Sequence, residues 1–240
     1  MNKWLTVADN TKRNAYIQIA EKSGMSAFAI EKDWWVVQTL SVIFGMEVGK
    51  HLLFKGGTSL SKAWKLIERF SEDIDLAIDR DFFGYNDELT KKEREKLRKA
   101  SGNYVDTVFF NKLKTAFADK GFSGLRVELV EEAESDKDRT INIFYPNVIP
   151  SPGYLQPKIQ LEIGCRSLRE PFTVQSFASL VDETYPDSEF AQMPIHVPTV
   201  NPKRSFLEKI FLLHEEFQRP AEKIRVNRLS RHLYDVYKIS

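Results

Sequence analysis

The stretch FKGGTSLSKAWKLIERFSEDIDLAI, residues 54–78, constrains the fold more than any other part of the chain. Gly56 and Gly57 follow a short apolar run and precede a segment with helical spacing, while Asp73 and Asp75 alternate with apolar residues as in a strand. Residues two apart on a strand point to the same face, so both carboxylates are expected on one side of a sheet. The pattern predicts a strand, a glycine turn, a helix and a second strand.

The residue types in this stretch suit the binding of a metal and of phosphate. Two like charges held side by side are unfavourable without a cation between them, and hard divalent ions such as Mg²⁺, with Mn²⁺ as an alternative, bind carboxylate oxygens. Glycines let a backbone approach a ligand closely, and Thr58 or Ser59 can cap the helix that follows. Because a helix start offers free N–H groups to anions, the stretch predicts phosphoryl or nucleotidyl transfer from a nucleoside triphosphate (NTP).

Two other motifs are excluded by the residues present. The phosphate loop of ordinary NTPases needs Gly-Lys-Ser/Thr after its glycines, and here Thr58 follows Gly57 directly. A calcium loop that starts at Asp73 needs an oxygen ligand and then a glycine where Ala77 and Ile78 stand. Taken singly, an Asp-x-Asp pair is more often a solvated strand face and a Gly-Gly pair a tight turn. Their combination favours a transferase.

Composition indicates a soluble globular chain. Its 240 residues are 42% hydrophobic, and the formal net charge is +1, so affinity for nucleic acid must come from local patches. The sequence has no apolar run long enough for a bilayer and no signal-peptide pattern, which predicts no membrane association and a cytoplasmic location. The single Cys165 cannot form an internal disulfide, fits a reducing compartment and is expected in the core.

Hydrophobic spacing predicts the order of helices and strands along the chain. Helices are expected over residues 10–49 and 88–120, with the strand–helix–strand unit over 50–80. Further strands are expected at GLRVELV, TINIFYP and KIQLEIG, and further helices at RSFLEKIFLLHEEF and NRLSRHLYDVYK. We therefore predict an α/β (α+β) fold. Residues 1–165 would form a catalytic core with a helical N-terminal preface, and 166–240 a mainly helical C-terminal part packed on it.

The strings GGTSL and RFSEDIDL resemble the first motif of the AbiEii/AbiGii abortive-infection toxin family, within the DNA polymerase β-like nucleotidyltransferase superfamily. The similarity extends more weakly from the KDWW segment near residue 32 to the final HLYDVYK. It implies a polymerase β-like core with a mixed sheet, and a toxin of a toxin–antitoxin or phage-defence pair. GGT stands where the superfamily commonly has glycine and serine, so either Thr58 or Ser59 would supply the hydroxyl.

Glu162 is the candidate for a third metal ligand. It lies between Leu161 and Ile163, which would face away from it on a strand. On this pattern alone, an exposed strand glutamate fits equally well. The resemblance implies a third carboxylate on a later strand, and so favours Asp73, Asp75 and Glu162 as metal ligands and catalytic residues.

Lys209 lies on a predicted helix whose apolar stripe is Phe206, Ile210, Leu213 and Phe217. It is three residues after Phe206 and four before Leu213, so it belongs to that stripe. A lysine turned toward the interior needs an anionic partner, which a triphosphate would supply; a lysine that snorkels at the edge of the stripe is the alternative. The resemblance implies a lysine that contacts nucleotide phosphates and contributes to catalysis.

Asp235 lies away from the stripe formed by Leu229, Leu233 and Val236, and on its own it would be an ordinary surface residue. The string Leu-Tyr-Asp-x-Tyr around it is similar to the last motif of the family. The resemblance implies that this aspartate is needed for activity, and it is included among the predicted catalytic residues.

The nucleotide is expected to bind around the glycine turn. Arg69 precedes the Asp-x-Asp strand and can either reach a phosphate or cap the end of its helix. The predicted nucleotide-binding residues are Lys55, Gly56, Gly57, Thr58, Ser59, Arg69 and Lys209.

Basic runs at residues 91–99 and 218–232 can guide an RNA backbone, although such runs are usually solvated helix faces. The leading hypothesis is a Mg²⁺-dependent transferase that moves an NMP group from an NTP to an acceptor. The resemblance implies tRNA ends as acceptor and a cognate antitoxin as partner. Two alternatives stay open: a nucleotide-binding regulatory module without turnover, and a transferase that modifies a small molecule or a protein hydroxyl.

Overall fold

The computed structural model describes residues 2–71, 73–85, 88–130, 138–153, 156–165, 170–223 and 229–240. Within these residues, seven strands form one sheet in the order β3-β4-β5-β2-β1-β7-β6. The strands are β1 (Leu52–Lys55), β2 (Ile74–Ile78), β3 (Arg126–Leu129), β4 (Arg139–Phe144), β5 (Lys158–Cys165), β6 (Phe172–Phe177) and β7 (Ile195–Val200). The sheet is mixed, because β2 pairs with β5 and β1 pairs with β7 in parallel, whereas the other neighbours are antiparallel.

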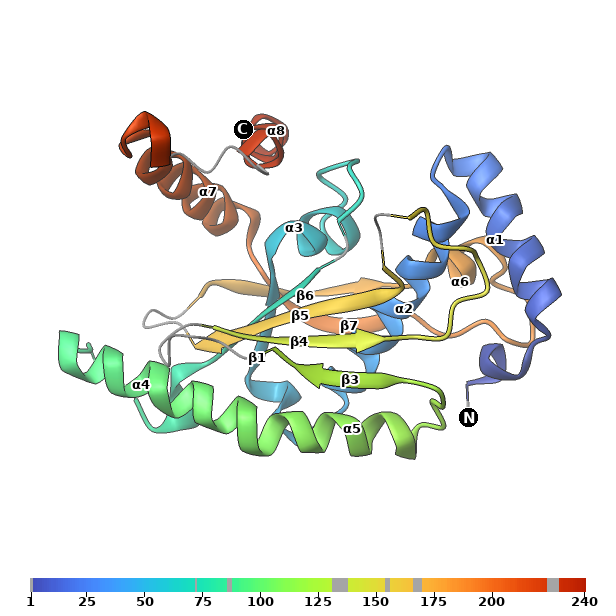
Figure 1. The fold of residues 1–240 in the computed structure, drawn as a ribbon, viewed down its shortest axis with the longest axis horizontal. Helices are drawn as coiled ribbons and strands as arrows, with labels where there is room; N and C mark the ends of the chain where they lie inside the picture. The colour runs from blue at the N-terminus through green and yellow to red at the C-terminus, as the bar shows by residue number, and fades with distance from the viewer. Residues whose placement is uncertain are drawn as a thin grey trace.

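Helices cover both faces and one end of this sheet (Figure 1). They are α1 (Asp9–Ser23), α2 (Ala27–Phe44), α3 (Gly56–Thr58), α4 (Lys91–Tyr104), α5 (Phe110–Asp119), α6 (Leu180–Thr184), α7 (Pro202–Phe217) and α8 (Leu229–Ile239). The short turn η3 (Ser59–Ala63) continues α3, and η5 (Val105–Phe109) joins α4 to α5. In Figure 1, α4 and α5 run along one side of the sheet, whereas α3, α7 and α8 lie on the other.

The mixed α/β fold predicted from the sequence is confirmed, with helices preceding the first strand and helices closing the chain. Local signals set several boundaries. Gly24, with φ of +72°, ends α1 in the left-handed conformation that glycine favours. Ser26 begins α2 by accepting a hydrogen bond from the Ala29 backbone N–H. The helix predicted over residues 88–120 and the strands predicted at the three apolar runs are also present.

The faces of β2 separate the hydrophobic core from the site. Ile74 and Leu76 are buried in the main core, and Cys165 lies in the same cluster. Asp75 points to the opposite face, as the alternation along a strand requires. That face carries a much smaller apolar cluster, formed by Leu53, Ala77 and Val200. The sheet is therefore apolar on one side and leaves room for charged groups on the other.

The predicted boundary at residue 165 does not separate a sheet from a helical part. Strands β6 and β7 lie after this position and belong to the same sheet, since β7 pairs with β1 and β6 pairs with β7. The mainly helical C-terminal part therefore begins with two strands. Helices α7 and α8 follow them and pack against each other.

The two C-terminal helices bury different faces from those predicted. The predicted α7 stripe was wrong at Ile210 and Phe217, since both are exposed, Phe217 by 56%. The buried residues of α7 are Ser205, Lys209, Leu213 and Glu216. In α8, Leu233 is half exposed, whereas Leu229 and Asp235 are buried. On these two helices, the buried positions include charged residues that form ion pairs as well as hydrophobic residues.

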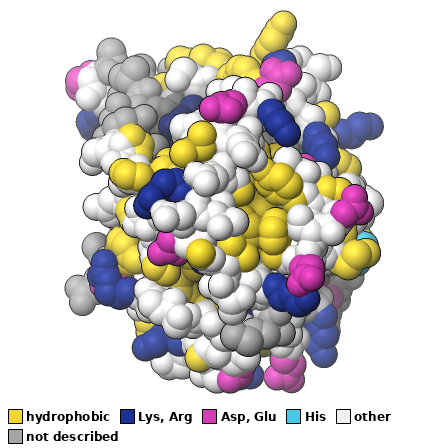
Figure 2. All heavy atoms as spheres, turned by 90° about the vertical axis from the view of Figure 1, so that its right-hand side faces the viewer, with side chains coloured by type: hydrophobic (Ala, Val, Ile, Leu, Met, Phe, Trp, Pro, Cys, Tyr) yellow, Lys and Arg dark blue, Asp and Glu magenta, His cyan; other side chains and the backbone are white. Residues whose placement is uncertain are grey.

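None of the helices within the described ranges is long and apolar enough to cross a membrane. Figure 2 views the side of the molecule where α1 and α6 lie. Hydrophobic side chains gather in the middle of this face, and most Lys, Arg, Asp and Glu side chains lie around them.

Candidate active site

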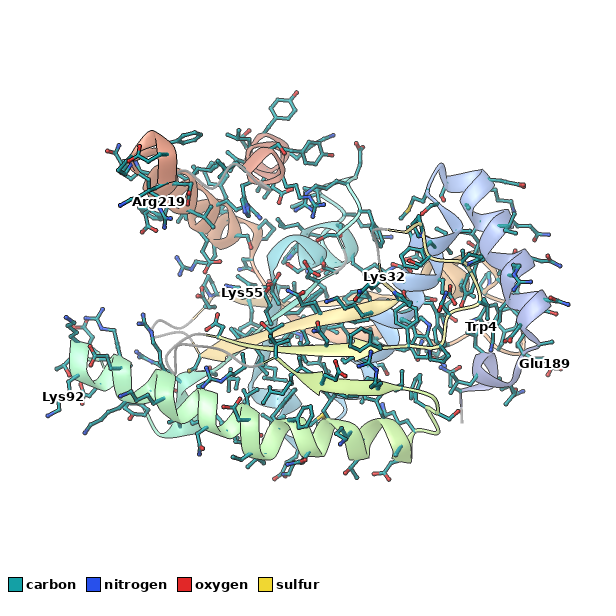
Figure 3. The ribbon with its side chains drawn as sticks, in the orientation of Figure 1. Trp4, Lys32, Lys55, Lys92, Glu189 and Arg219 are labelled. Carbon is teal, nitrogen blue, oxygen red and sulfur yellow. The ribbon has the colours of Figure 1, made fainter. Side chains whose placement is uncertain are left out.

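A row of charged side chains crosses three neighbouring strands. Lys55 at the end of β1 is in register with Asp75 on β2, and Asp75 is in register with Glu162 on β5. Residues directly opposite on neighbouring strands point to the same face of a sheet. Lys55 lies on the side that faces α7, where Figure 3 labels it. The structure thus brings together two of the three predicted carboxylates and one predicted phosphate-binding lysine.

Gly56 lies directly beneath the Asp75 carboxylate. A Cβ at this position would lie 1.8 Å from Asp75 Oδ2, and the backbone φ is +74°. Both the space and the backbone conformation therefore require glycine. The glycine turn is what allows the carboxylate to lie over the start of α3.

The pKa of Asp75 is raised to about 7. Burial is the largest cause, the neighbouring charge of Glu162 adds to it, and Lys55 opposes it. Asp73, which immediately precedes β2, raises the pKa further. A carboxylate crowded by two others in this way binds a proton or a cation more readily than an isolated one.

The second glycine brings the chain against two polar side chains. A Cβ on Gly57 would lie 2.7 Å from a guanidinium nitrogen of Arg69 and 2.8 Å from Ser71 Oγ. Thr58 Oγ1 donates to the Asp73 carbonyl oxygen at 2.5 Å and lies 3.0 Å from Ser71 Oγ. This turn therefore links α3 to the residues that lead into β2.

The two hydroxyls predicted for phosphate binding are used inside the protein. Thr58 and Ser59 are buried, and Ser59 Oγ donates to the Gly56 carbonyl oxygen at 2.9 Å. The Ser71 hydroxyl lines the cavity described below, whereas those of Thr58 and Ser59 do not. The sequence analysis missed Ser71, although Ser71, Asp73 and Asp75 alternate as residues on one strand face do.

A buried aspartate joins two cations above the sheet. Asp235 is 0% exposed, and its two oxygens accept hydrogen bonds from Arg69 Nε and Nη2 at 2.7 and 2.6 Å. Lys209 Nζ lies 2.9 Å from Asp235 Oδ2. Burial raises the pKa of Asp235, but the hydrogen bonds from Arg69 and Lys209 outweigh it and leave the pKa below its ordinary value. Asp235 is thus an anchor for two cations rather than a surface residue.

Lys55 has its own anionic partner on α7. Its Nζ lies 3.1 Å from a carboxylate oxygen of Glu208, the residue before Lys209. Arg204, one turn earlier, lies 3.5 Å from the other oxygen of Glu208 and 2.5 Å from Glu170. A chain of alternating charges therefore connects α7 to the sheet.

These groups surround a cavity of about 320 Å³. Its lining comprises Lys55, Gly56, Gly57, Arg69, Ser71, Asp73, Asp75, Glu162, Ser205, Glu208, Lys209, Leu212, Arg231 and His232. Besides Ser71, the sequence analysis missed Glu208, Arg231 and His232. Glu208 could have been suspected from its place beside Lys209. The basic run at 218–232 pointed to Arg231, while residues 224–228 of that run lie outside the described part of the chain.

The predicted metal ligands line one cavity without forming a compact cluster. Within the described ranges, no three Asp, Glu, His or Cys side chains converge closely enough to hold a metal ion together. Asp75 and Glu162 lie side by side in register, and Asp73 lines the same space. The oxygen donors and the raised pKa of Asp75 fit a hard divalent cation, and these three residues would hold it.

Comparison with known proteins relates this geometry to a family. The family model described as nucleotidyl transferase AbiEii toxin, type IV toxin–antitoxin system, matches residues 44–240. No curated protein matches the sequence. Among solved structures, the chain is similar to the nucleotidyltransferase toxin MenT4 of Mycobacterium tuberculosis H37Rv, with 18% identity and a TM-score of 0.46 over 89% of this chain and 68% of that one. Because the family model spans most of the sequence, including every residue that lines the charged cavity, this chain belongs to the AbiEii nucleotidyltransferase toxin family.

Proposed function

We propose that this chain transfers an NMP group from an NTP to an acceptor hydroxyl in the cavity between the sheet and α7. The row formed by Lys55, Asp75 and Glu162 beside the glycine turn carries this proposal. Cations and carboxylates line the same cavity, so the cations can bind a triphosphate while the carboxylates bind a divalent metal. Membership of the AbiEii family supports the same chemistry.

Asp73, Asp75 and Glu162 are the residues that would hold Mg²⁺ or Mn²⁺. The bound metal would lower the pKa of the acceptor hydroxyl and neutralise charge on the departing pyrophosphate. Lys55 lies beside Asp75, and its positive charge partly balances the negative charges of the carboxylates.

The triphosphate would lie against the cations that close the cavity. Arg69 and Lys209 are fixed by Asp235, and Lys55 is fixed by Glu208. A guanidinium has five N–H donors and an ammonium has three, so each cation keeps donors for phosphate oxygens while it stays anchored. Cations held in place in this way stabilise developing charge without reorganising during the reaction.

The transfer itself breaks one phosphoanhydride bond and forms one phosphoester bond. The acceptor oxygen attacks the α-phosphorus, the bond from that phosphorus to the bridging oxygen breaks, and pyrophosphate leaves. The carboxylates of the cavity are the bases available to take the hydroxyl proton. Lys209 and Arg69 would stabilise the charge that gathers on the phosphates.

We infer that the acceptor is RNA, with tRNA ends as the first candidate. The basic run at residues 91–99 forms the first part of α4, and its Lys and Arg side chains are exposed. Exposed cations on one helix favour contact with a phosphate backbone. The type IV toxin–antitoxin family implies a cognate antitoxin, and a role in phage defence fits that class.

A labelling experiment tests this function. The purified chain is incubated with Mg²⁺, each [α-³²P]NTP in turn, and either tRNA, other cellular RNA, a protein fraction or a small polyol. We expect label in tRNA from at least one [α-³²P]NTP, none from the corresponding [γ-³²P]NTP, and none with Asp75→Asn. Label from the γ-position, or undiminished transfer by Asp75→Asn, would contradict the proposal. Label in the protein or polyol fraction, and none in RNA, would show that the acceptor is a protein or a small molecule instead of RNA.

A further inference from the structure

A second cavity of about 270 Å³ adjoins the charged one. The two share Arg69 and Ser71 in their linings, so they lie side by side and meet at these two residues. The second cavity lies between the start of α2, the turn η3, residues 67–71 and the start of α6. It has no part in the chemistry described above.

The two cavities differ in the kind of surface that they offer. Among the described residues that line the charged cavity, Leu212 is the one hydrophobic side chain. The second cavity presents five such side chains: Met25, Val36, Ile67, Phe70 and Leu180. A nucleotide has two halves with the same contrast, since its phosphates are anionic and its base has two apolar faces. The charged cavity offers a base Leu212 and the planar side chains of Arg231 and His232, whereas the second cavity offers a larger apolar surface.

Polar groups in the second cavity suit the edge of a base. Lys62 Nζ lies 2.7 Å from Asp33 Oδ1, in a largely buried ion pair, and its ammonium keeps further N–H donors. Ser61 Oγ donates to the Thr58 carbonyl oxygen and keeps its own lone pairs as acceptors. Donor, acceptor and apolar walls together are the usual composition of a small-molecule site.

The rim of this cavity contains an unusual backbone conformation. Lys65 has φ of +54°, a left-handed value that costs a non-glycine residue energy. It is the one non-glycine residue with positive φ among those described. The Lys65 ammonium lies 3.7 Å from Glu183 on α6, so an ion pair joins two sides of the cavity at its exposed end.

We propose that the second cavity is a nucleobase-binding subsite, which holds the base of a nucleotide whose phosphates lie in the charged cavity. Phe70, a half-buried aromatic residue in the shared segment, would stack on the base. The base belongs either to the incoming NTP or to the terminal nucleotide of the acceptor RNA, because both present the same chemistry. This inference rests on the proposed function.

Direct binding tests the subsite without requiring turnover. Dissociation constants are measured by calorimetry with Mg²⁺ for each NTP, for inorganic triphosphate and for a short single-stranded RNA. The variants are Phe70→Ala, which removes the stacking ring, and Met25→Trp, which fills the cavity. The matched control is Leu66→Ala, which shortens an exposed side chain of the same segment that does not line either cavity. Thermal unfolding confirms that each variant folds.

Loss of one stacked base costs about 1–3 kcal/mol, so each site variant should raise a dissociation constant by roughly fivefold to a hundredfold. If the NTP constant rises and the constant for inorganic triphosphate does not, the subsite takes the base of the NTP. If only the RNA constant rises, it takes the acceptor base. The inference is overturned if neither dissociation constant changes by more than twofold. It is also overturned if the dissociation constant for inorganic triphosphate rises as much as that for the NTP. Failure of the proposed function is distinct, because it appears as absence of label transfer by the unaltered chain.

Discussion

The charged cavity and the second cavity share two lining residues, Arg69 and Ser71, but are built in different ways. Around the first, Lys55 and Arg69 each have an anionic partner that is distant in sequence, Glu208 and Asp235 respectively. Around the second, five lining side chains are apolar, and the charges include two ion pairs, Asp33 with Lys62 and Lys65 with Glu183. The short connection between η3 and β2 faces both. The difference teaches that one short segment can line two neighbouring cavities of different character.

Replacement of Asp75 by Asn gives the largest expected effect and tests whether the charged cavity alone performs the reaction. The amide keeps the shape but removes the negative charge between Lys55 and Glu162. We expect label transfer to fall by at least about a thousandfold, because stabilisation of charge at the reacting phosphate usually contributes more to catalysis than any other effect. Initial rates of tRNA labelling measure this effect.

The control for that variant is Asp79→Asn, at the residue that directly follows the other end of β2 and lies outside both cavities. Its transfer rate should stay within a few-fold of the original. If Asp75→Asn retained more than a tenth of the rate, the assignment of the reaction to this cavity would fail.

Replacement of Asp235 by Asn tests whether the cations are functional only while anchored. Removing one partner of a buried ion pair leaves the others uncompensated and costs about 3 kcal/mol. We expect the free energy of unfolding to fall by that amount and kcat by roughly a hundredfold, since Arg69 and Lys209 lose their common partner. Urea denaturation and steady-state rates give the two values.

Glu216→Gln is the matched control, because Glu216 is also a buried acid, lies on α7 and pairs with Arg219 outside the cavity. It should lower stability and leave kcat nearly unchanged. Equal losses of kcat in Asp235→Asn and Glu216→Gln would show that stability, rather than the position of the cations, explains the first result.

Gly56→Ala tests whether the backbone conformation of the glycine turn positions the Asp75 carboxylate. The new Cβ would meet the Asp75 carboxylate at 1.8 Å, and alanine would have to adopt φ of +74°. We expect a loss of about 2–3 kcal/mol in stability, together with a roughly tenfold loss of activity as Asp75 is displaced. Thermal unfolding and labelling measure the two effects.

Gly84 provides the control, because its φ is +78° but nothing lies within 4 Å of an added Cβ. Gly84→Ala should lose about 1 kcal/mol from backbone strain and keep its activity. If both variants behaved alike, the contact between Gly56 and Asp75 would have no importance of its own.

The smallest expected effect is a pH dependence of stability in the absence of divalent metal. The folded pKa of Asp75 is raised to about 7, above its ordinary value, so between about pH 4 and 7 the unfolded chain releases a proton that the folded chain keeps. Stability is therefore lost as pH rises through this window. Asp75→Asn should be more stable than the original chain by on the order of 1–2 kcal/mol at pH 8 and by little at pH 4.

Urea denaturation in EDTA at the two pH values checks this prediction. Burial also raises the pKa of Glu31 to about 7, so the original chain has more than one such contribution. The difference between the original and Asp75→Asn isolates the site. A constant difference across pH would contradict the assigned pKa.

Local sequence patterns predicted the parts of the site that depend on neighbouring residues. The alternation around Asp75 and around Glu162 gave the correct faces, and Gly56 marked the turn. The pairing of Asp75 with Glu162 could not be predicted, because register between β2 and β5 is set by packing across 87 positions of the chain.

The elements that were missed lacked the usual signals. Strand β6 lies at the edge of the sheet and is exposed along most of its length, with Phe172 and Val174 facing solvent. Strand β7 contains Pro198, a residue that argues against a strand. Asp235 was placed on the solvated side of its helix because its partners, Arg69 and Lys209, come from other elements. The second cavity was missed for the same reason, since α2, η3 and α6 meet only in three dimensions.

The dependence of Arg69 and Lys209 on Asp235 also orders events during synthesis of the protein. The glycine turn and the acidic strand leave the ribosome early, whereas the anchor for their cations is encoded 166 positions after Arg69. Folding proceeds broadly from the N-terminus as a chain emerges. A nascent polypeptide therefore exposes Arg69 long before the residue that fixes it, and the pairing of Arg69 with Asp235 forms only after Asp235 has been made.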